Sequence, residues 1–166
     1  MTAIILKIRR QPYLGFALFG CVFLLAALIA GVQEFAVPES WRFLWQVATG
    51  AFLTLAIVYQ WILLVQRLTR AAPAIQRSYY MNHRWVGSAS FFLFALHAIS
   101  FGHMLTNALA VLFIGCAITG VMNKEIMKYR REWTYQLWFG VHVAFSALLA
   151  PLIIAHIWVA LAFEGI

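Results

Sequence analysis

The chain has 166 residues, of which 64% are hydrophobic and 10% charged, and its mean hydropathy is +0.86. A soluble domain of this length is nearer half apolar, so the composition excludes a soluble globular protein and leaves no room for a separate aqueous domain. The net charge of +7 comes from short segments between apolar runs rather than from one continuous basic face, which disfavours nucleic-acid binding. We therefore expect an integral membrane protein that forms a single domain over residues 1–166.

Five apolar runs follow one another along the chain, each about as long as the 20-residue helix that spans a bilayer. Every backbone polar group must be hydrogen-bonded inside the hydrocarbon, so each run is predicted to be an α-helix. The predicted fold class is all-α, an integral membrane bundle of five transmembrane helices. The predicted helices cover residues 13–32, 43–65, 80–102, 105–122 and 135–163.

The first run follows Lys7, Arg9 and Arg10, as the apolar part of a signal peptide follows its charged start. It is longer than the apolar part of a typical signal peptide, so we expect an uncleaved membrane anchor. Between the second and third runs, RLTRAAPAIQRSYYMNHR (67–84) is expected to be the longest loop, interrupted by Pro73. Its arginines are expected to lie near lipid phosphates or simply to set the topology.

The positive charges between the runs predict the orientation of the chain. If five helices alternate in direction, all Lys and Arg residues except Arg42 fall on one side of the membrane. Cytoplasmic loops carry an excess of Lys and Arg, so we expect a multi-pass protein of the bacterial inner (plasma) membrane. Its N-terminus would be cytoplasmic and its C-terminus outside, on the periplasmic side. The charges on the cytoplasmic side are Lys7, Arg9, Arg10, Arg67, Arg70, Arg77, Arg84, Lys124, Lys128, Arg130 and Arg131.

Four of the five histidines lie in the third and fifth runs, in two pairs with the same spacing. His83 and His97 are 14 residues apart, and so are His142 and His156. Fourteen residues turn an α-helix through about 1,400°, which is about 40° short of four turns, and advance it by about 21 Å. Both members of a pair therefore face nearly the same way. Because the fourth run returns the chain, the third and fifth helices are expected to run in the same direction.

These spacings predict two levels of facing imidazoles. His83 and His142 can share a depth on the cytoplasmic side, and His97 and His156 can share a depth on the outer side. A b-type haem takes one imidazole on each axial face. The sequence therefore predicts two b haems, with iron ligands His83 and His142 at the inner level and His97 and His156 at the outer level.

Other residues of the two helices bear on this prediction. On the face of the third helix that carries both histidines lie Gly87, Ser90 and Phe94, and the small residues are predicted to leave room for a macrocycle. In the fifth helix, Pro151 is predicted to cause a kink that shifts the phase of His156.

Other roles for these histidines stay open. A histidine in a membrane helix often hydrogen-bonds within the bundle or takes part in a proton relay. A single four-histidine zinc or copper site is disfavoured because the two levels are about 21 Å apart.

His103 lies about 240° around the predicted helix from His97. It is expected to be interfacial, or to meet a haem propionate, a quinone or an outer acceptor. Arg84 and the segment NKEIMKYRREW are expected to neutralise haem propionates or to set the topology.

HRWVGSASFFLFALHA and WFGVHVAFSALLAPLIIAHIWVAL, within about residues 80–162, resemble the ferric-reductase-like transmembrane domain family. That family includes NADPH oxidases, metalloreductases and the haem-binding membrane subunit of a bacterial methionine-sulfoxide-repair system. The resemblance implies two b haems with His83, His97, His142 and His156 as ligands. The family's transmembrane unit usually has six helices, whereas five are expected here, and many of its members continue into a flavin and nicotinamide domain.

We therefore expect a transmembrane electron-transfer protein, an oxidoreductase component without its own flavin or nicotinamide domain, since no G-x-G-x-x-G motif occurs. The donor is expected to be a cytoplasmic-side carrier or a quinol, and the acceptor an outer-side molecule or a partner protein. A quinone-linked cytochrome b anchor subunit of a larger redox complex would use the same ligands and stays open. So does a haem-free assembly or interaction subunit. Membrane lipid and a redox partner are the expected contacts.

Overall fold

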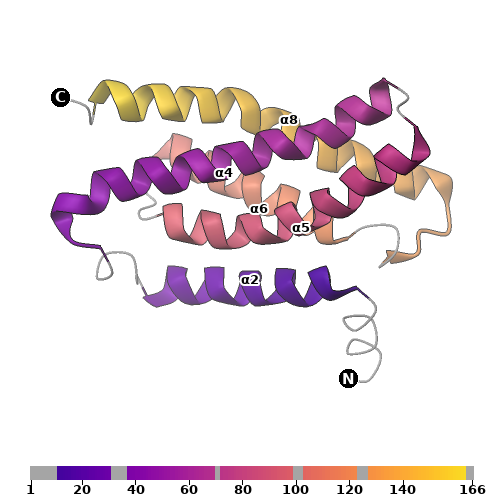
Figure 1. Cartoon of the computed structure of the whole chain (residues 1–166), viewed down its shortest axis with the longest axis horizontal. Coiled ribbons are helices and arrows are strands. Elements are labelled where there is room, and N and C mark those ends of the chain that lie inside the picture. The colour runs from indigo at the N-terminus through magenta and orange to yellow at the C-terminus, as the bar shows by residue number, and fades with distance from the viewer. Residues whose placement is uncertain (1–10, 31–36, 70–71, 99–102, 123–126, 164–166) are drawn as a thin grey trace. The chain divides into compact units, whose positions relative to one another are not determined.

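The computed structural model describes residues 11–30, 37–69, 72–98, 103–122 and 127–163. Within these residues the chain is all-helical, with five helices (Figure 1), which confirms the all-α part of the predicted fold class. Their bounds are α2 (Pro12–Ala30), α4 (Glu39–Leu68), α5 (Pro73–His97), α6 (Met104–Val121) and α8 (Glu132–Phe163).

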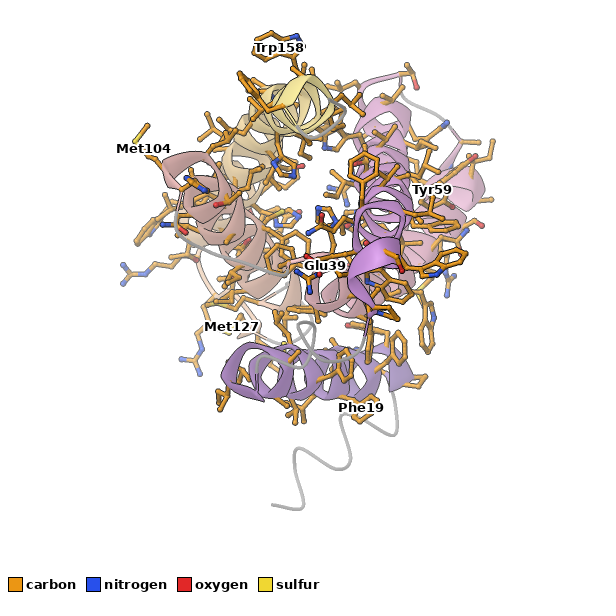
Figure 2. All side chains as sticks on the ribbon, turned by 90° about the vertical axis from the view of Figure 1, so that its left-hand side faces the viewer. Phe19, Glu39, Tyr59, Met104, Met127 and Trp158 are labelled. Carbon is orange, nitrogen blue, oxygen red and sulfur yellow. The ribbon has the colours of Figure 1, made fainter. Side chains whose placement is uncertain are left out.

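Three of these helices, α4, α6 and α8, are long and apolar enough to cross a membrane. In α2 the apolar segment Pro12–Ala27 is shorter. Large apolar side chains lie on the outside of the helices: Phe19 of α2 is 61% exposed and Trp158 of α8 is 67% exposed, and both project outward (Figure 2). Extensive apolar surface of this kind suits lipid better than water. The structure thus supports the transmembrane character predicted from composition, and this implies contact with lipid.

The start of α5 differs from the prediction. The helix begins at Pro73, which occupies the first helical turn. There its missing N–H would have had no intrahelical partner, and its fixed φ suits the helix. Ala72 is extended, with ψ 142°, as the residue before a proline prefers. The prediction of a loop interrupted by Pro73 is therefore wrong for residues 73–79, because this proline starts the helix instead of breaking it.

The bounds of the other helices differ less from the predicted ones. α4 extends beyond the predicted range 43–65 at both ends, with Glu39 in its first turn and Arg67 in its last, as the helix dipole favours. α5 ends at His97, since Ala98 is extended (φ −76°, ψ 91°). Several features of the prediction lie outside the described residues: the helix ends 31–32 and 99–102, and the charged residues Lys7, Arg9, Arg10, Arg70 and Lys124.

The helices form two compact units, residues 1–99 and 100–166, and the single-domain prediction stays a prediction. In the first unit α5 packs against both α4 and α2. Close packing and interhelical hydrogen bonds join these helices. The buried apolar side chains of this unit are Tyr13, Ala17, Leu24, Leu53, Ile57, Leu63, Phe91, Phe94 and Ala95.

Within the first unit, α2 approaches α5 closely at Gly20. A Cβ at this position would lie 2.9 Å from the Cβ of Phe91 and 3.4 Å from the carbonyl oxygen of Ser88. The Ser88 hydroxyl lies 3.2 Å from the Tyr13 carbonyl oxygen, to which it can donate across the same interface. A small residue and a hydroxyl together thus let the two backbones meet, as is typical of membrane helix pairs.

In the second unit, α6 and α8 pack together and run antiparallel. Thr119, near the end of α6, contacts Trp138, near the start of α8, whereas the earlier Gly115 contacts the later Phe145. A Cβ at Gly115 would lie 2.9 Å from Cε2 of Phe145, so a glycine again allows the close approach. α8 continues through Pro151 as one helix, and the predicted shift in the phase of His156 stays a prediction.

We expect Gly20→Ala to destabilise the protein by about 1–3 kcal/mol, because the new methyl group overlaps the Cβ of Phe91, which no side-chain rotation can move away. Thermal unfolding in detergent, followed by far-UV circular dichroism, measures the change.

Gly140→Ala is the matched control, because a Cβ at Gly140 would meet nothing within 4 Å. Alanine is favoured over glycine inside a helix by about 0.5–1 kcal/mol, so this variant should be neutral or slightly stabilised. Equal unfolding temperatures for the Gly20 and Gly140 variants would show that α2 does not approach α5 in this way.

Candidate functional site

The structure places the four predicted ligands on two helices, one in each unit. His83 and His97 lie on α5, and His142 and His156 lie on α8. All four side chains are half-buried. The pairing of His83 with His142 and of His97 with His156 stays a prediction. What the structure adds is the set of groups that hold His97 and His142 from a neighbouring helix of the same unit.

His97 is held by α4. Its Nδ1 lies 3.1 Å from the carbonyl oxygen of Gln46 and 3.4 Å from Oγ1 of Thr49. A carbonyl oxygen can only accept a hydrogen bond, so Nδ1 must carry the proton. In the neutral imidazole this assignment puts the lone pair on Nε2, which is then the nitrogen able to bind a metal.

Two further residues of α4 lie close to His97 and to the end of α5. A Cβ on Gly50 would lie 2.7 Å from Cε1 of His97, so only glycine leaves room for the imidazole there. The indole N–H of Trp45 donates to the carbonyl oxygen of Leu96 at 3.0 Å. The carbonyls of a last helical turn lack intrahelical partners, and Trp45 supplies one. α4 thus fixes both the ring of His97 and the backbone just before it.

His142 is held by α6 in a corresponding way. Its Nδ1 lies 2.9 Å from Oγ1 of Thr119. The Thr119 hydroxyl also lies 2.8 Å from the carbonyl oxygen of Gly115 and 2.9 Å from that of Cys116. When the hydroxyl donates to these carbonyls, its oxygen can accept from Nδ1–H of His142. This assignment puts the His142 proton on Nδ1 and its lone pair on Nε2.

Trp138 completes the surroundings of His142. Its ring stacks on the imidazole, with centroids 6.1 Å apart and planes 8° apart. Its indole N–H donates to the carbonyl oxygen of Thr119 at 2.7 Å. Trp138 therefore touches both the ligand candidate and the residue that accepts the proton of that ligand. The sulfur of Cys116 lies 3.9 Å from Nδ1 of His142.

The residues that hold the two histidines recur as a dipeptide. Thr-Gly occurs twice in the sequence, at Thr49-Gly50 and Thr119-Gly120. Like Gly50 at His97, Gly120 faces its histidine, and a Cβ there would lie 3.4 Å from Cε1 of His142. Sequence reasoning missed these residues. The signal that could have found them is the same dipeptide in the second and the fourth apolar runs.

The predicted room for a macrocycle beside Gly87, Ser90 and Phe94 stays a prediction, and the structure places Gln60 of α4 against two of these residues. A Cβ at Gly87 would lie 3.2 Å from Oε1 of Gln60, and Nε2 of Gln60 lies 3.4 Å from the Ser90 hydroxyl. Ser90 and Phe94 are only 2% and 6% exposed. Gly87 and Ser90 thus admit the Gln60 side chain of α4 within the first unit.

The remaining predicted residues lie as follows. His103 is an exposed residue that precedes α6, and its carbonyl oxygen accepts from Thr106. It therefore does not lie about 240° around α5 from His97, since α5 has already ended.

Arg84 lies over the rings of Tyr80 and Tyr13, with its Cζ 4.1 Å and 4.8 Å from their centroids, and donates to the Tyr80 hydroxyl. Among the described residues, no three His, Cys, Asp or Glu side chains gather as metal ligands.

We expect Gly50→Ala to displace the His97 ring, because the new methyl would overlap Cε1. ¹⁵N NMR of histidine-labelled protein should show both His97 and His142 protonated on Nδ1 in the wild type, and only the His97 signals changed in this variant. Gly120→Ala is the control, since 3.4 Å is an ordinary contact and the His142 signals should persist. Unchanged His97 signals in the Gly50 variant would contradict the packing of the ring on α4.

No family model, curated protein or solved structure matches this chain. What the residues do must therefore be inferred from their chemistry. The resemblance to the ferric-reductase-like domain stays an expectation drawn from the quoted segments.

Proposed function

We propose that this chain is a transmembrane cytochrome that carries electrons across the bacterial inner membrane through two bis-histidine b haems. One observation carries the proposal. His97 and His142, on different helices, both give the proton of Nδ1 to an acceptor on a neighbouring helix. Metal-bound histidines almost always use their second nitrogen in this way, because the bond fixes the tautomer and orients the ring.

The donor set fits the group in its chemistry, since imidazole nitrogens are ligands of haem iron. Each haem would take one histidine from α5 and one from α8, with His83 and His142 at the inner level and His97 and His156 at the outer level. Both spacings of 14 residues fall inside continuous helices, α5 and α8, which supports two levels about 21 Å apart. A bound haem supplies one-electron chemistry at its iron, and the protein supplies orientation, dryness and electrostatics.

The topology proposed has five spans, with a cytoplasmic N-terminus and an outer C-terminus. Its support is the three long apolar helices, the antiparallel neighbours within each unit and the positive charges on one side of the alternating helices. α5 carries Arg77 and Arg84 in its first half and packs against both α2 and α4. We propose that this half lies at the cytoplasmic interface, where long basic side chains reach the headgroups.

Charge at the inner level bears on the electron path. Arg84, Lys128, Arg130 and Arg131 would all lie on the cytoplasmic side. Positive charge favours the reduced state of a nearby haem, which carries one electron more, and so raises its reduction potential. We propose a donor on the cytoplasmic side or a quinol, and an outer-side acceptor or partner protein.

The haem content of the purified protein tests the proposal. After expression with sufficient haem, the reduced-minus-oxidised spectrum should show b-type bands, and the pyridine haemochrome assay should give two haems per chain. His83→Ala, His97→Ala, His142→Ala and His156→Ala should each remove about one haem's absorbance, because each takes away one axial ligand.

His103→Ala is the control and should retain both haems, since His103 is an exposed residue at the start of α6. Absence of b-type bands would favour a haem-free assembly subunit. Full haem content in all four ligand variants would show that other residues bind the haem. Co-purification with a catalytic subunit and a quinone would instead favour the anchor subunit of a larger redox complex.

A further inference from the structure

We infer that Thr119 is a positioning residue that sets the reduction potential of the haem held by His142, whereas Thr49, its counterpart at His97, does so far less. This inference rests on the proposed function, and it adds a difference between the two haem sites. The Thr-Gly dipeptide recurs, but the acceptors around the two imidazoles are not equivalent.

At His142, the acceptor is a side chain. Oγ1 of Thr119 lies 2.9 Å from Nδ1, and its own proton is directed at the carbonyls of Gly115 and Cys116. This arrangement orients the oxygen lone pair towards the imidazole. Trp138 adds a second restraint, because it stacks on the His142 ring and donates to the Thr119 carbonyl. The hydroxyl is thus held in place as an acceptor, and a single substitution removes it.

At His97, the nearer acceptor is the backbone. The carbonyl oxygen of Gln46 lies 3.1 Å from Nδ1, whereas Oγ1 of Thr49 lies 3.4 Å away. The Thr49 hydroxyl lies 2.7 Å from the Trp45 carbonyl oxygen and donates to it. Substitution of Thr49 therefore leaves the Gln46 carbonyl available to His97. The backbone acceptor makes the threonine at this site largely redundant.

The hydrogen bond acts on the iron through the imidazole. When Nδ1–H donates to an oxygen, electron density on the ring rises and Nε2 becomes a more basic ligand. A more basic ligand favours ferric over ferrous iron and lowers the reduction potential. Loss of the acceptor should therefore raise the potential of the His142 haem and leave the other haem unchanged.

Thr119→Val tests this, because valine keeps the shape of threonine and lacks the hydroxyl. Redox titration of the purified protein, with haem content measured in parallel, should still find two haems. At a given potential, the ratio of ferrous to ferric iron in the His142 haem should rise about tenfold. For a one-electron couple this is a shift of the reduction potential by about 59 mV. Thr119→Ser keeps the hydroxyl and should restore the wild-type potential. A merely structural role would lower haem content or stability without moving the potential of the retained haem.

Thr49→Val is the matched control. In this variant the ferrous-to-ferric ratio of each haem should stay within about twofold of the wild-type value, because the Gln46 carbonyl still accepts from His97. The inference is overturned if Thr119→Val retains both haems at wild-type potentials, or if Thr49→Val shifts its haem as much. Loss of a haem in Thr119→Val, with the retained haem at its wild-type potential, would show a structural role for Thr119 and would also overturn the inference. A wild-type protein that binds no haem would overturn the proposed function itself.

Discussion

The histidine sites depend on one constraint, which is that a polar group in the hydrocarbon needs a partner. An imidazole brings two nitrogens into the helix bundle, and an unsatisfied polar group there costs several kcal/mol. In this protein a neighbouring helix accepts the proton of Nδ1 at both His97 and His142, through the Gln46 carbonyl and the Thr119 hydroxyl. The same bond determines which nitrogen keeps its lone pair. The contact that satisfies the ring thus also sets its tautomer.

Close approach of the helices makes this bond possible. Gly50 replaces a side chain that would compete with the His97 imidazole for space, and Gly20 and Gly115 do the same for aromatic residues. In lipid, apolar burial gives little driving force for helix association, so such contacts matter more than they would in water. At His97 the two effects occur together, because Gly50 admits the ring and the Gln46 carbonyl accepts its proton.

Small and polar residues of α5 serve the packing of the first unit. Gly87 and Ser90 share the histidine face, and α4 places Gln60 against them. The half-buried Gln60 donates to the buried Ser90 hydroxyl and so links two helices in a way that apolar side chains cannot.

The sequence by itself determined the class of protein, the number of helices found in the described residues and the positions of the four histidines along them. These follow from composition and from helical period, both of which are properties of a single segment. Pro73 was misjudged because a proline breaks a helix in its interior but suits its first turn, and only the backbone distinguishes the two cases. The roles of Thr49, Gly50, Thr119 and Gln60 could not be predicted from single segments. Periodicity reports which face of a helix a residue occupies, whereas the neighbour that covers this face, and the atom it offers, are decided only when the helices pack.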